Sequence, residues 1–412
     1  MQMGTNLPKV GTYNRAVVLE AVQASDGISR VQIAAVTGLT PQAVSVIVRR
    51  LLEDGLVVED GSAPGAGGKP RTILRVDPAA GYALGIHFDP GEVSYVLADL
   101  AGRPLVKLHR PVRGAEPEPV VRTLARTARR LLKEAGVPDH KVLGVGLASP
   151  GPLDPDGVIV TPPRLPGWDG VPIRSLLERH VGYPVTVDND ATAAAIGERW
   201  AGLARAVPSF AYLYLGTGIG GGLFLDGQVY RGRTLNAAEF GHVTVMPDGP
   251  ECYCGNRGCV EALCCPSAMV ATVRERLALG AESVLRRGRL SHAALCAAAA
   301  AGDPLARSVA EQAADRLADA AVSVVNMLDV DLLVLGGPAV RELGGLYRDV
   351  IGRAVSTRVL ARGLQAVRVE VSPIAADAAA IGAASLVFHV TYAPRLDRLV
   401  RECGGGPGGW PR

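Results

Sequence analysis

Two spacings of apolar residues divide the chain. Between residues 13 and 56, apolar positions recur every three or four residues, which is the spacing of the buried face of short helices. After Tyr82, short apolar runs such as residues 142–147 and 331–335 alternate with helix-like stretches. Alternating strands and helices are typical of α/β proteins. The pattern therefore predicts a small helical domain and a larger α/β body, separated near residues 77–81.

Residues 13–75 have the pattern of a winged helix-turn-helix. The first helix is expected at about residues 13–24 and the second after Ser29, and a glycine-containing turn leads to the third. Thr40 followed by Pro41 is a strong start for that third helix, because threonine caps a helix and proline suits its first turn. This helix would enter the major groove of DNA. We expect DNA contacts from side chains at its start and on its exposed face: Thr40, Gln42, Ser45 and Arg49.

Two short strands, at residues 56–59 and 71–76, are expected to complete this domain as a wing. The Gly/Pro-rich segment between them predicts a flexible tip, from which Lys69 and Arg71 could enter the minor groove. Residues 1–78 carry eight basic and seven acidic side chains, so DNA affinity would depend on placement and oligomerisation. The alternative is a winged helix that serves only as a protein-interaction module.

Composition narrows the classes of function. The chain has 412 residues, of which 48% are hydrophobic and 20% charged, and its net charge is +3. This small net charge does not by itself indicate a nucleic-acid or membrane partner. The first residues lack the apolar core of a secretory signal, and no run of about 18 apolar residues occurs. We expect a cytoplasmic protein. Its seven cysteines, an odd number, fit a reducing compartment and metal ligation better than disulfides.

One segment, residues 239–261, gives the strongest chemical signal. Three cysteines in a C-x-C-x4-C arrangement follow a histidine at a distance of ten residues: His242, Cys252, Cys254 and Cys259. Three thiolates and an imidazole fill a closed tetrahedral site for Zn²⁺ and leave no position for a catalytic water. We therefore expect a structural zinc ion that holds the flanking Glu239 and Glu261 rigidly. The alternative is a set of reduced cysteines beside an unrelated histidine.

Polar side chains also follow a predicted strand at residues 184–187. Asp188, Asn189 and Asp190 come directly after it, at the end of a strand where α/β sheets bind ligands. Asp190 could act as a general base toward a sugar hydroxyl, hydrogen-bond it, or only cap the following helix. The glycine-rich residues 216–222 could present backbone N–H groups to phosphate, although glycines in strands also mark close backbone contacts.

The order of elements after residue 81 predicts a two-lobed body. A hairpin, a third strand, a helix and a fourth strand between residues 82 and 147 are the opening of an actin-like, sugar-kinase-like half. The expected fold is α/β, with an N-terminal winged helix-turn-helix followed by a two-lobed actin-like (ribonuclease H-like, ASKHA) ATPase-type fold. The expected divisions are 1–78 for DNA binding, 79–190 for the first lobe with helix 375–390 returning to it, 191–374 for the second lobe with the zinc loop, and 391–412 for a tail.

At these residues the chain resembles the ROK family of repressors, open reading frames and sugar kinases. The resemblance is carried by E-F-G-H followed by C-Y-C-G-N-R-G-C-V-E, by D-N-D-A-T-A-A-A-I-G-E and by G-T-G-I-G-G-G, and it extends from Asn14 to about His389. It implies a sugar-binding body, a structural Zn²⁺ and a homodimer or homotetramer. By the same resemblance, sugar hydroxyls would be bound by Asn189, Asp190, Glu239, His242 and Glu261.

Two departures from the family pattern bear on activity. Kinases of the family have a D-x-G-G-T phosphate loop, whereas the aligned positions here include His87, Asp89 and Pro90. Asp89 would repel phosphate and Pro90 lacks a backbone donor, so we expect no kinase activity. Arg164 stands where the family commonly has asparagine and could change which sugar is accepted.

The expected function is a sugar-responsive transcriptional regulator, most simply a repressor that binds operator DNA. A sugar would close the two lobes and change the spacing of the recognition helices. One alternative is an active ATP-dependent sugar kinase with an added DNA-binding domain, in which Asp190 is the catalytic base. Another is a regulator that has lost sugar binding and responds to a protein or a phosphorylated effector.

Overall fold

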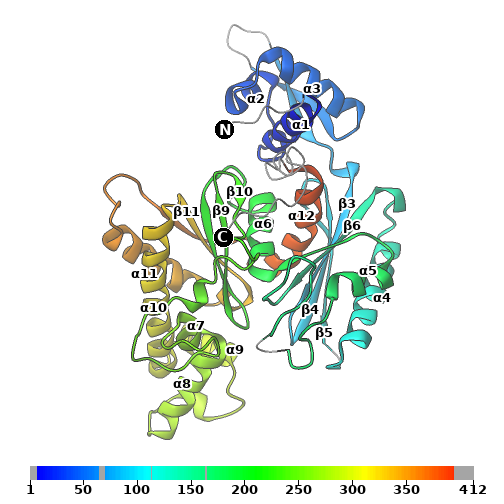
Figure 1. Cartoon of the computed structure of the whole chain (residues 1–412). Helices are drawn as coiled ribbons and strands as arrows, with labels where there is room; N and C mark the ends of the chain where they lie inside the picture. Colours follow the sequence, from blue (N-terminus) through cyan, green and yellow to red (C-terminus); the bar gives the residue numbers. More distant parts are fainter. Residues whose placement is uncertain (1–6, 65–69, 113, 163–164, 394–412) are drawn as a thin grey trace, which may run out of the picture.

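A small domain stands at one end of a two-lobed body in the computed structural model (Figure 1). The structure describes residues 7–64, 70–112, 114–162 and 165–393. Lys69, Arg164 and residues 394–412 of the predicted tail lie outside these ranges.

The small domain is the predicted winged helix-turn-helix. Its elements are α1 (Leu7–Gln23), α2 (Arg30–Thr37), α3 (Pro41–Glu53), β1 (Val57–Ala63) and β2 (Arg71–Val76). Ser29 caps α2 in a reciprocal pair with Gln32, and the Thr40 side chain accepts from the backbone N–H of Ala43 at the start of α3. Both predicted helix starts are confirmed. The first helix begins earlier than its apolar spacing indicated, and the two wing strands pair antiparallel.

The first lobe contains a five-stranded sheet in the order β5-β4-β3-β6-β7. Its strands are β3 (Tyr82–Phe88), β4 (Glu92–Asp99), β5 (Pro104–Pro111), β6 (Val142–Ser149) and β7 (Val185–Asn189). The first three are antiparallel and the last two run parallel to β3. Apolar residues of α4 (Pro117–Ala135) and α5 (Ile173–Val181) share one core with this sheet.

The second lobe repeats this arrangement with the order β10-β9-β8-β11-β12. Its strands are β8 (Phe210–Leu215), β9 (Ile219–Leu225), β10 (Gln228–Val229), β11 (Leu332–Gly336) and β12 (Arg368–Val371). Its helices are α7 (Val260–Cys264), α8 (Pro266–Ala278), α9 (His292–Ala300), α10 (Pro304–Leu328) and α11 (Gly344–Arg358). The apolar run at residues 331–335 corresponds to β11, as predicted, whereas α5 and α11 were not predicted.

Two helices, α6 (Asp190–Ala201) and α12 (Ala378–Tyr392), pack together between the two sheets (Figure 1). A Cβ on Gly382 of α12 would lie 1.8 Å from the carbonyl oxygen of Ala193, so only glycine permits this approach. Among the described residues, segment 375–392 is the one unbroken helical stretch long and apolar enough to cross a membrane. Every residue of α12 from Ala378 to Phe388 is buried, so its apolar character belongs to the interior of the body.

The glycine-rich residues 216–222 belong to two different features, a turn and a strand, and the strand glycines make close contacts. Strand β9 starts at Ile219, so Gly220 to Gly222 lie inside the sheet. A Cβ on Gly222 would lie 2.5 Å from Cβ of Ala195 in α6. These glycines therefore serve close packing between helix and strand. The turn itself consists of residues 216–218.

Candidate functional site

A cavity of about 560 Å³ opens between the two lobes. Its lining includes all five residues that the family resemblance indicated for sugar binding: Asn189, Asp190, Glu239, His242 and Glu261. The first two come from the junction of β7 and α6, and the other three from the segment around the cysteine-rich loop of the second lobe. The fold therefore gathers residues up to 72 positions apart in the sequence around one cavity.

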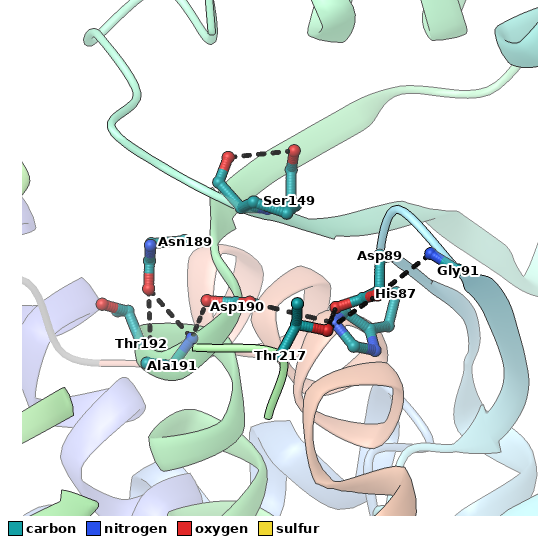
Figure 2. A network of polar contacts seen from close by, with 10 residues as sticks. His87, Asp89, Gly91, Ser149, Asn189, Asp190, Ala191, Thr192 and Thr217 are labelled. Atoms are coloured by element: carbon teal, nitrogen blue, oxygen red, sulfur yellow. Dashed lines mark hydrogen bonds and ion pairs between the residues drawn. The ribbon is translucent and has the colours of Figure 1, made fainter. Parts of the chain in front are cut away.

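Asn189 and Asp190 divide two roles at the start of α6 (Figure 2). The Asn189 Oδ1 atom accepts from the backbone N–H groups of Ala191 at 2.9 Å and Thr192 at 3.4 Å, so asparagine is the helix cap. Asp190 Oδ1 also accepts from Ala191, at 2.8 Å. Its Oδ2 points toward Nε2 of His87 at a distance of 4.0 Å. Asp190 is thus more than a capping residue, because its second oxygen is directed toward His87 of β3.

The electrostatics of the cavity favour a neutral, hydroxyl-bearing ligand. Burial raises the pKa of Asp190 to about 7, and the negative charges of Asp89, Glu239 and Glu261 add to that rise. Burial also raises the pKa of Glu239 and lowers that of His87, so the imidazole is neutral near pH 7. A carboxyl that titrates near neutrality can donate or accept a hydrogen bond, whereas an anionic ligand would meet several negative charges.

The two turns that would grip ATP phosphates are joined to each other. Oγ1 of Thr217, in the turn between β8 and β9, lies 2.9 and 3.1 Å from the carboxylate oxygens of Asp89, in the turn between β3 and β4 (Figure 2). Asp89 also accepts from the backbone N–H of Gly91 at 3.1 Å. A carboxylate and a cross-lobe hydrogen bond therefore stand where the predicted phosphate grip would be. Sequence reasoning identified Asp89 but missed Thr217, which the motif shows only as a residue between glycines.

Glu261 links the cysteine-rich loop to the glycine-rich turn. Its side chain is buried, and its Oε2 accepts from the backbone N–H of Ile219 at 2.7 Å. It lies in the first turn of α7, two residues after Cys259. The cysteine-rich loop therefore determines the position of one wall of the cavity.

The predicted ligands His242, Cys252, Cys254 and Cys259 form one cluster. Their ligand atoms all lie within 4.8 Å of one another. Nδ1 of His242 is 3.6 Å from the Cys252 sulfur, and the sulfurs of Cys254 and Cys259 are 3.8 Å apart. A tetrahedral ion with bonds of about 2.3 Å to sulfur would hold its ligand atoms about 3.7 Å apart. The donor set and its spacing thus fit a tetrahedral metal ion.

The predicted DNA-binding side chains on α3 are exposed. These are Thr40, Gln42, Ser45 and Arg49. Thr40 caps the helix and Ser45 donates to the carbonyl of Pro41 at 2.8 Å, so both hydroxyls also serve the helix itself. Nε of Arg49 is 4.0 Å from Glu53, and both side chains remain mostly exposed. Arg71 starts β2 at the described end of the wing and is half-buried.

The winged helix packs firmly against the far end of α6. Arg199 Nη2 contacts Glu20 Oε1 of α1 at 2.6 Å, and Gln23 Nε2 donates to the carbonyl of Trp200 at 2.8 Å. Trp200 in turn donates to the carbonyl of Leu100 at 3.2 Å. The apolar core of the winged helix is continuous with residues of the body: Ala83, Ala98, Leu100, Trp200, Ala384, Val387 and Phe388. One helix therefore reaches from the cavity to the small domain.

Comparison with known proteins agrees with both parts of the fold. Residues 93–390 match the model of the ROK family, and residues 12–65 match that of the MarR family. The chain belongs to the ROK family. The xylose repressor of Caldicellulosiruptor bescii is 26% identical over 381 residues, which cover 91% of this chain and 95% of the repressor.

Solved structures of the family resemble this chain over different extents. A ROK family transcriptional regulator, described as a homologue of Escherichia coli Mlc, covers 95% of this chain and 99% of its own, with a TM-score of 0.77 and 24% identity. The ROK hexokinase of Thermus thermophilus covers 75% of this chain and 98% of its own, with a TM-score of 0.62 and 34% identity. The xylose repressor and the transcriptional regulator thus match more than 90% of this chain, whereas the hexokinase matches three quarters of it.

Proposed function

We propose that this ROK family protein is a cytoplasmic transcriptional repressor that releases operator DNA when a sugar binds between its lobes. The observation that supports this best is that a single helix, α6, joins the winged helix-turn-helix to a cavity lined by carboxylate, amide and imidazole side chains. The xylose repressor that matches over 91% of this chain supports the same function. Asn189, Asp190, Glu239, His242 and Glu261 would bind the sugar hydroxyls, and α3 with the wing would bind the operator.

Helix α6 supplies a physical route between the two activities. Its twelve residues span about 18 Å, at about 1.5 Å per residue. Asp190 at its start faces the cavity, and Arg199 and Trp200 at its end contact α1. A sugar that draws Asp190 toward Glu239 and Glu261 would move the helix and the attached small domain together. In a homodimer or homotetramer, this would change the separation of the recognition helices.

A structural Zn²⁺ is part of the proposal. The three cysteines and Nδ1 of His242 would hold it, and it would supply no chemistry beyond fixing the loop. Burial raises the pKa of Cys259 to about 12, and a dication bound by the cluster would favour the thiolate form of this ligand. The fixed loop then holds Glu239, Glu261 and Nε2 of His242 at the cavity.

The test is operator binding with and without sugar. Purified zinc-loaded protein should retard a DNA fragment from upstream of its own gene, and D-xylose or D-glucose should weaken that binding by at least about tenfold. Fluorescence anisotropy at several salt concentrations separates specific from general DNA affinity. Failure to bind any promoter fragment at low salt would contradict the DNA-binding part. Binding that no sugar changes would contradict the sugar-responsive part.

A kinase is the second candidate, favoured by one observation. The pKa of about 7 makes Asp190 a suitable general base for a sugar hydroxyl. Asp89, Pro90 and the hydrogen bond from Thr217 oppose this function, because phosphoryl transfer needs an open and electropositive grip on ATP. A coupled ADP-release assay over common hexoses decides between the two, and turnover that Asp190→Asn abolishes would establish the kinase.

A further inference from the structure

Tyr253 lies between two metal-ligating cysteines and reaches into the cavity that the proposed function assigns to sugar. Its hydroxyl is 3.1 Å from Nε2 of His242, and its ring meets the imidazole edge to face, with centroids 5.2 Å apart and planes at 87°. It lines the same cavity as Asp190, Glu239 and Glu261. The phenol therefore occupies a polar position, beside two carboxylates, that would also suit a sugar hydroxyl.

The histidine has one ring nitrogen available to a ligand, and Tyr253 holds it. Nδ1 of His242 faces the Cys252 sulfur at 3.6 Å, on the side of the metal cluster. Nε2 faces the cavity, where its described partner is the Tyr253 hydroxyl. The charges of Glu261 and Glu239 add to burial in raising the pKa of Tyr253, which agrees with a phenol held close to both carboxylates.

The attachment of Tyr253 allows it to leave without disturbing the loop. The side chain is 57% exposed, so little packing holds it beyond the hydroxyl and the ring contact. The backbone on either side is fixed by Cys252 and Cys254 if the metal is bound. Rotation about the side-chain bonds is thus enough to free Nε2, at the cost of the phenol's hydrogen bonds to His242 and to Glu261.

We infer that Tyr253 is an internal competitor of the effector, whose hydroxyl occupies the sugar-facing nitrogen of His242 until a sugar hydroxyl replaces it. This inference rests on the proposed sugar-binding function and deepens it. Tyr253 would set the affinity for the effector and would select ligands that bring a hydroxyl to Nε2. A sugar lacking that hydroxyl could not take over the bond.

The test compares Tyr253→Phe with the wild type by titration calorimetry, using zinc-loaded full-length protein with D-xylose, D-glucose and monodeoxy analogues of whichever sugar binds. Phenylalanine keeps the ring and removes the competing hydroxyl. We expect the affinity to become roughly two- to tenfold tighter, as the loss of one neutral hydrogen bond predicts. For the deoxy analogue that lacks the hydroxyl meeting Nε2, the substitution should change affinity little. Tyr230→Phe is the matched control, because Tyr230 is similarly exposed, at 52%, and does not line the cavity.

Each outcome has a distinct meaning. Weaker binding by Tyr253→Phe would show that the phenol is a sugar contact, and equal binding would show that it plays no part; either result overturns the competitor role while leaving the sugar-binding function intact. If neither protein binds any sugar of the panel, the proposed function fails and this inference fails with it.

Discussion

The two ends of α6 differ in the kind of contact they make. At the start, Asn189 and Asp190 bond to the backbone of their own helix, and Asp190 lines a polar cavity. At the end, Arg199 and Trp200 bond directly to α1, and Trp200 is buried in a core shared with the winged helix. The first end can exchange partners with a ligand. The second is packed and can only move together with its neighbour.

This difference indicates how one helix can serve recognition and response. Bonds within α6 keep Asp190 in place when no ligand is present, so the ligand-binding end is prepared before binding. Close packing at the other end converts a small displacement into movement of a domain, because packed interfaces shift as units. Substitutions at the two ends should therefore separate sugar affinity from DNA response.

Disruption of the His242/Cys252/Cys254/Cys259 cluster should have the largest effect, and it should change sugar affinity without changing operator affinity. Cys254→Ala removes one of four ligands and should lower sugar affinity by at least about 100-fold, because Glu239, His242 and Glu261 lose their fixed positions. Operator affinity should persist, measured by anisotropy. Chelation should reproduce the loss in the wild type, and added zinc should reverse it. Cys265→Ala, outside the cluster, is the control, and normal sugar affinity in Cys254→Ala would refute the arrangement.

Asp190→Asn should have the next largest effect, again at the recognition end. Because Asp190 is proposed to bond sugar hydroxyls, replacement of its carboxylate should cost about 2 kcal/mol, or about thirtyfold in affinity. The side chains are of nearly equal size, so the fold and operator binding should be unchanged. Calorimetry and a thermal melt of the ligand-free protein check both points. Sugar binding of wild-type strength would exclude Asp190 as a ligand.

Sugar affinity should also depend on pH through Asp190. Its pKa of about 7 in the free protein means that the carboxyl is mostly protonated at pH 6 and mostly ionised at pH 8. If the sugar hydroxyls donate to the carboxylate, binding favours the ionised form and lowers its pKa. Affinity should then rise about tenfold from pH 6 to pH 8, with proton release near neutrality. Asp190→Asn should flatten this profile, whereas a rise that persists in the variant would assign the titration to another group.

The smallest expected effect is at the docking end. Glu20→Gln weakens the partly buried ion pair with Arg199. The factor by which saturating sugar lowers operator affinity should therefore be about five times smaller than in the wild type, which is a loss of about 1 kcal/mol in coupling free energy. Affinity for sugar alone should be unchanged. Asp26→Asn is the matched control, because Asp26 contacts Arg205 at 3.3 Å but is 94% exposed. Equal coupling in both variants would show that the Glu20–Arg199 contact does not transmit the response.

The sequence predicted local features correctly where residues close together in the chain decide the structure. The starts of α2 and α3 follow from Ser29 and Thr40, whose caps involve residues only three positions away. The metal cluster follows from the spacing of His242 and three cysteines within one loop. The choice between the two roles predicted for the glycine-rich stretch depends on what lies opposite it, since Ala195 of α6 packs against Gly222. No local signal shows such a neighbour.

The sequence by itself determined the starts of α2 and α3, their cap residues and the donor set of the His/Cys cluster, because each depends on side chains a few positions apart. Only the tertiary structure decided that Thr217 closes onto Asp89, 128 residues away, and that Glu20 meets Arg199, 179 residues away. It also placed Tyr253 against His242 within the cavity. These contacts depend on how two sheets and a small domain pack around α6 and α12, which is a property of whole surfaces and leaves no mark in the spacing of residues.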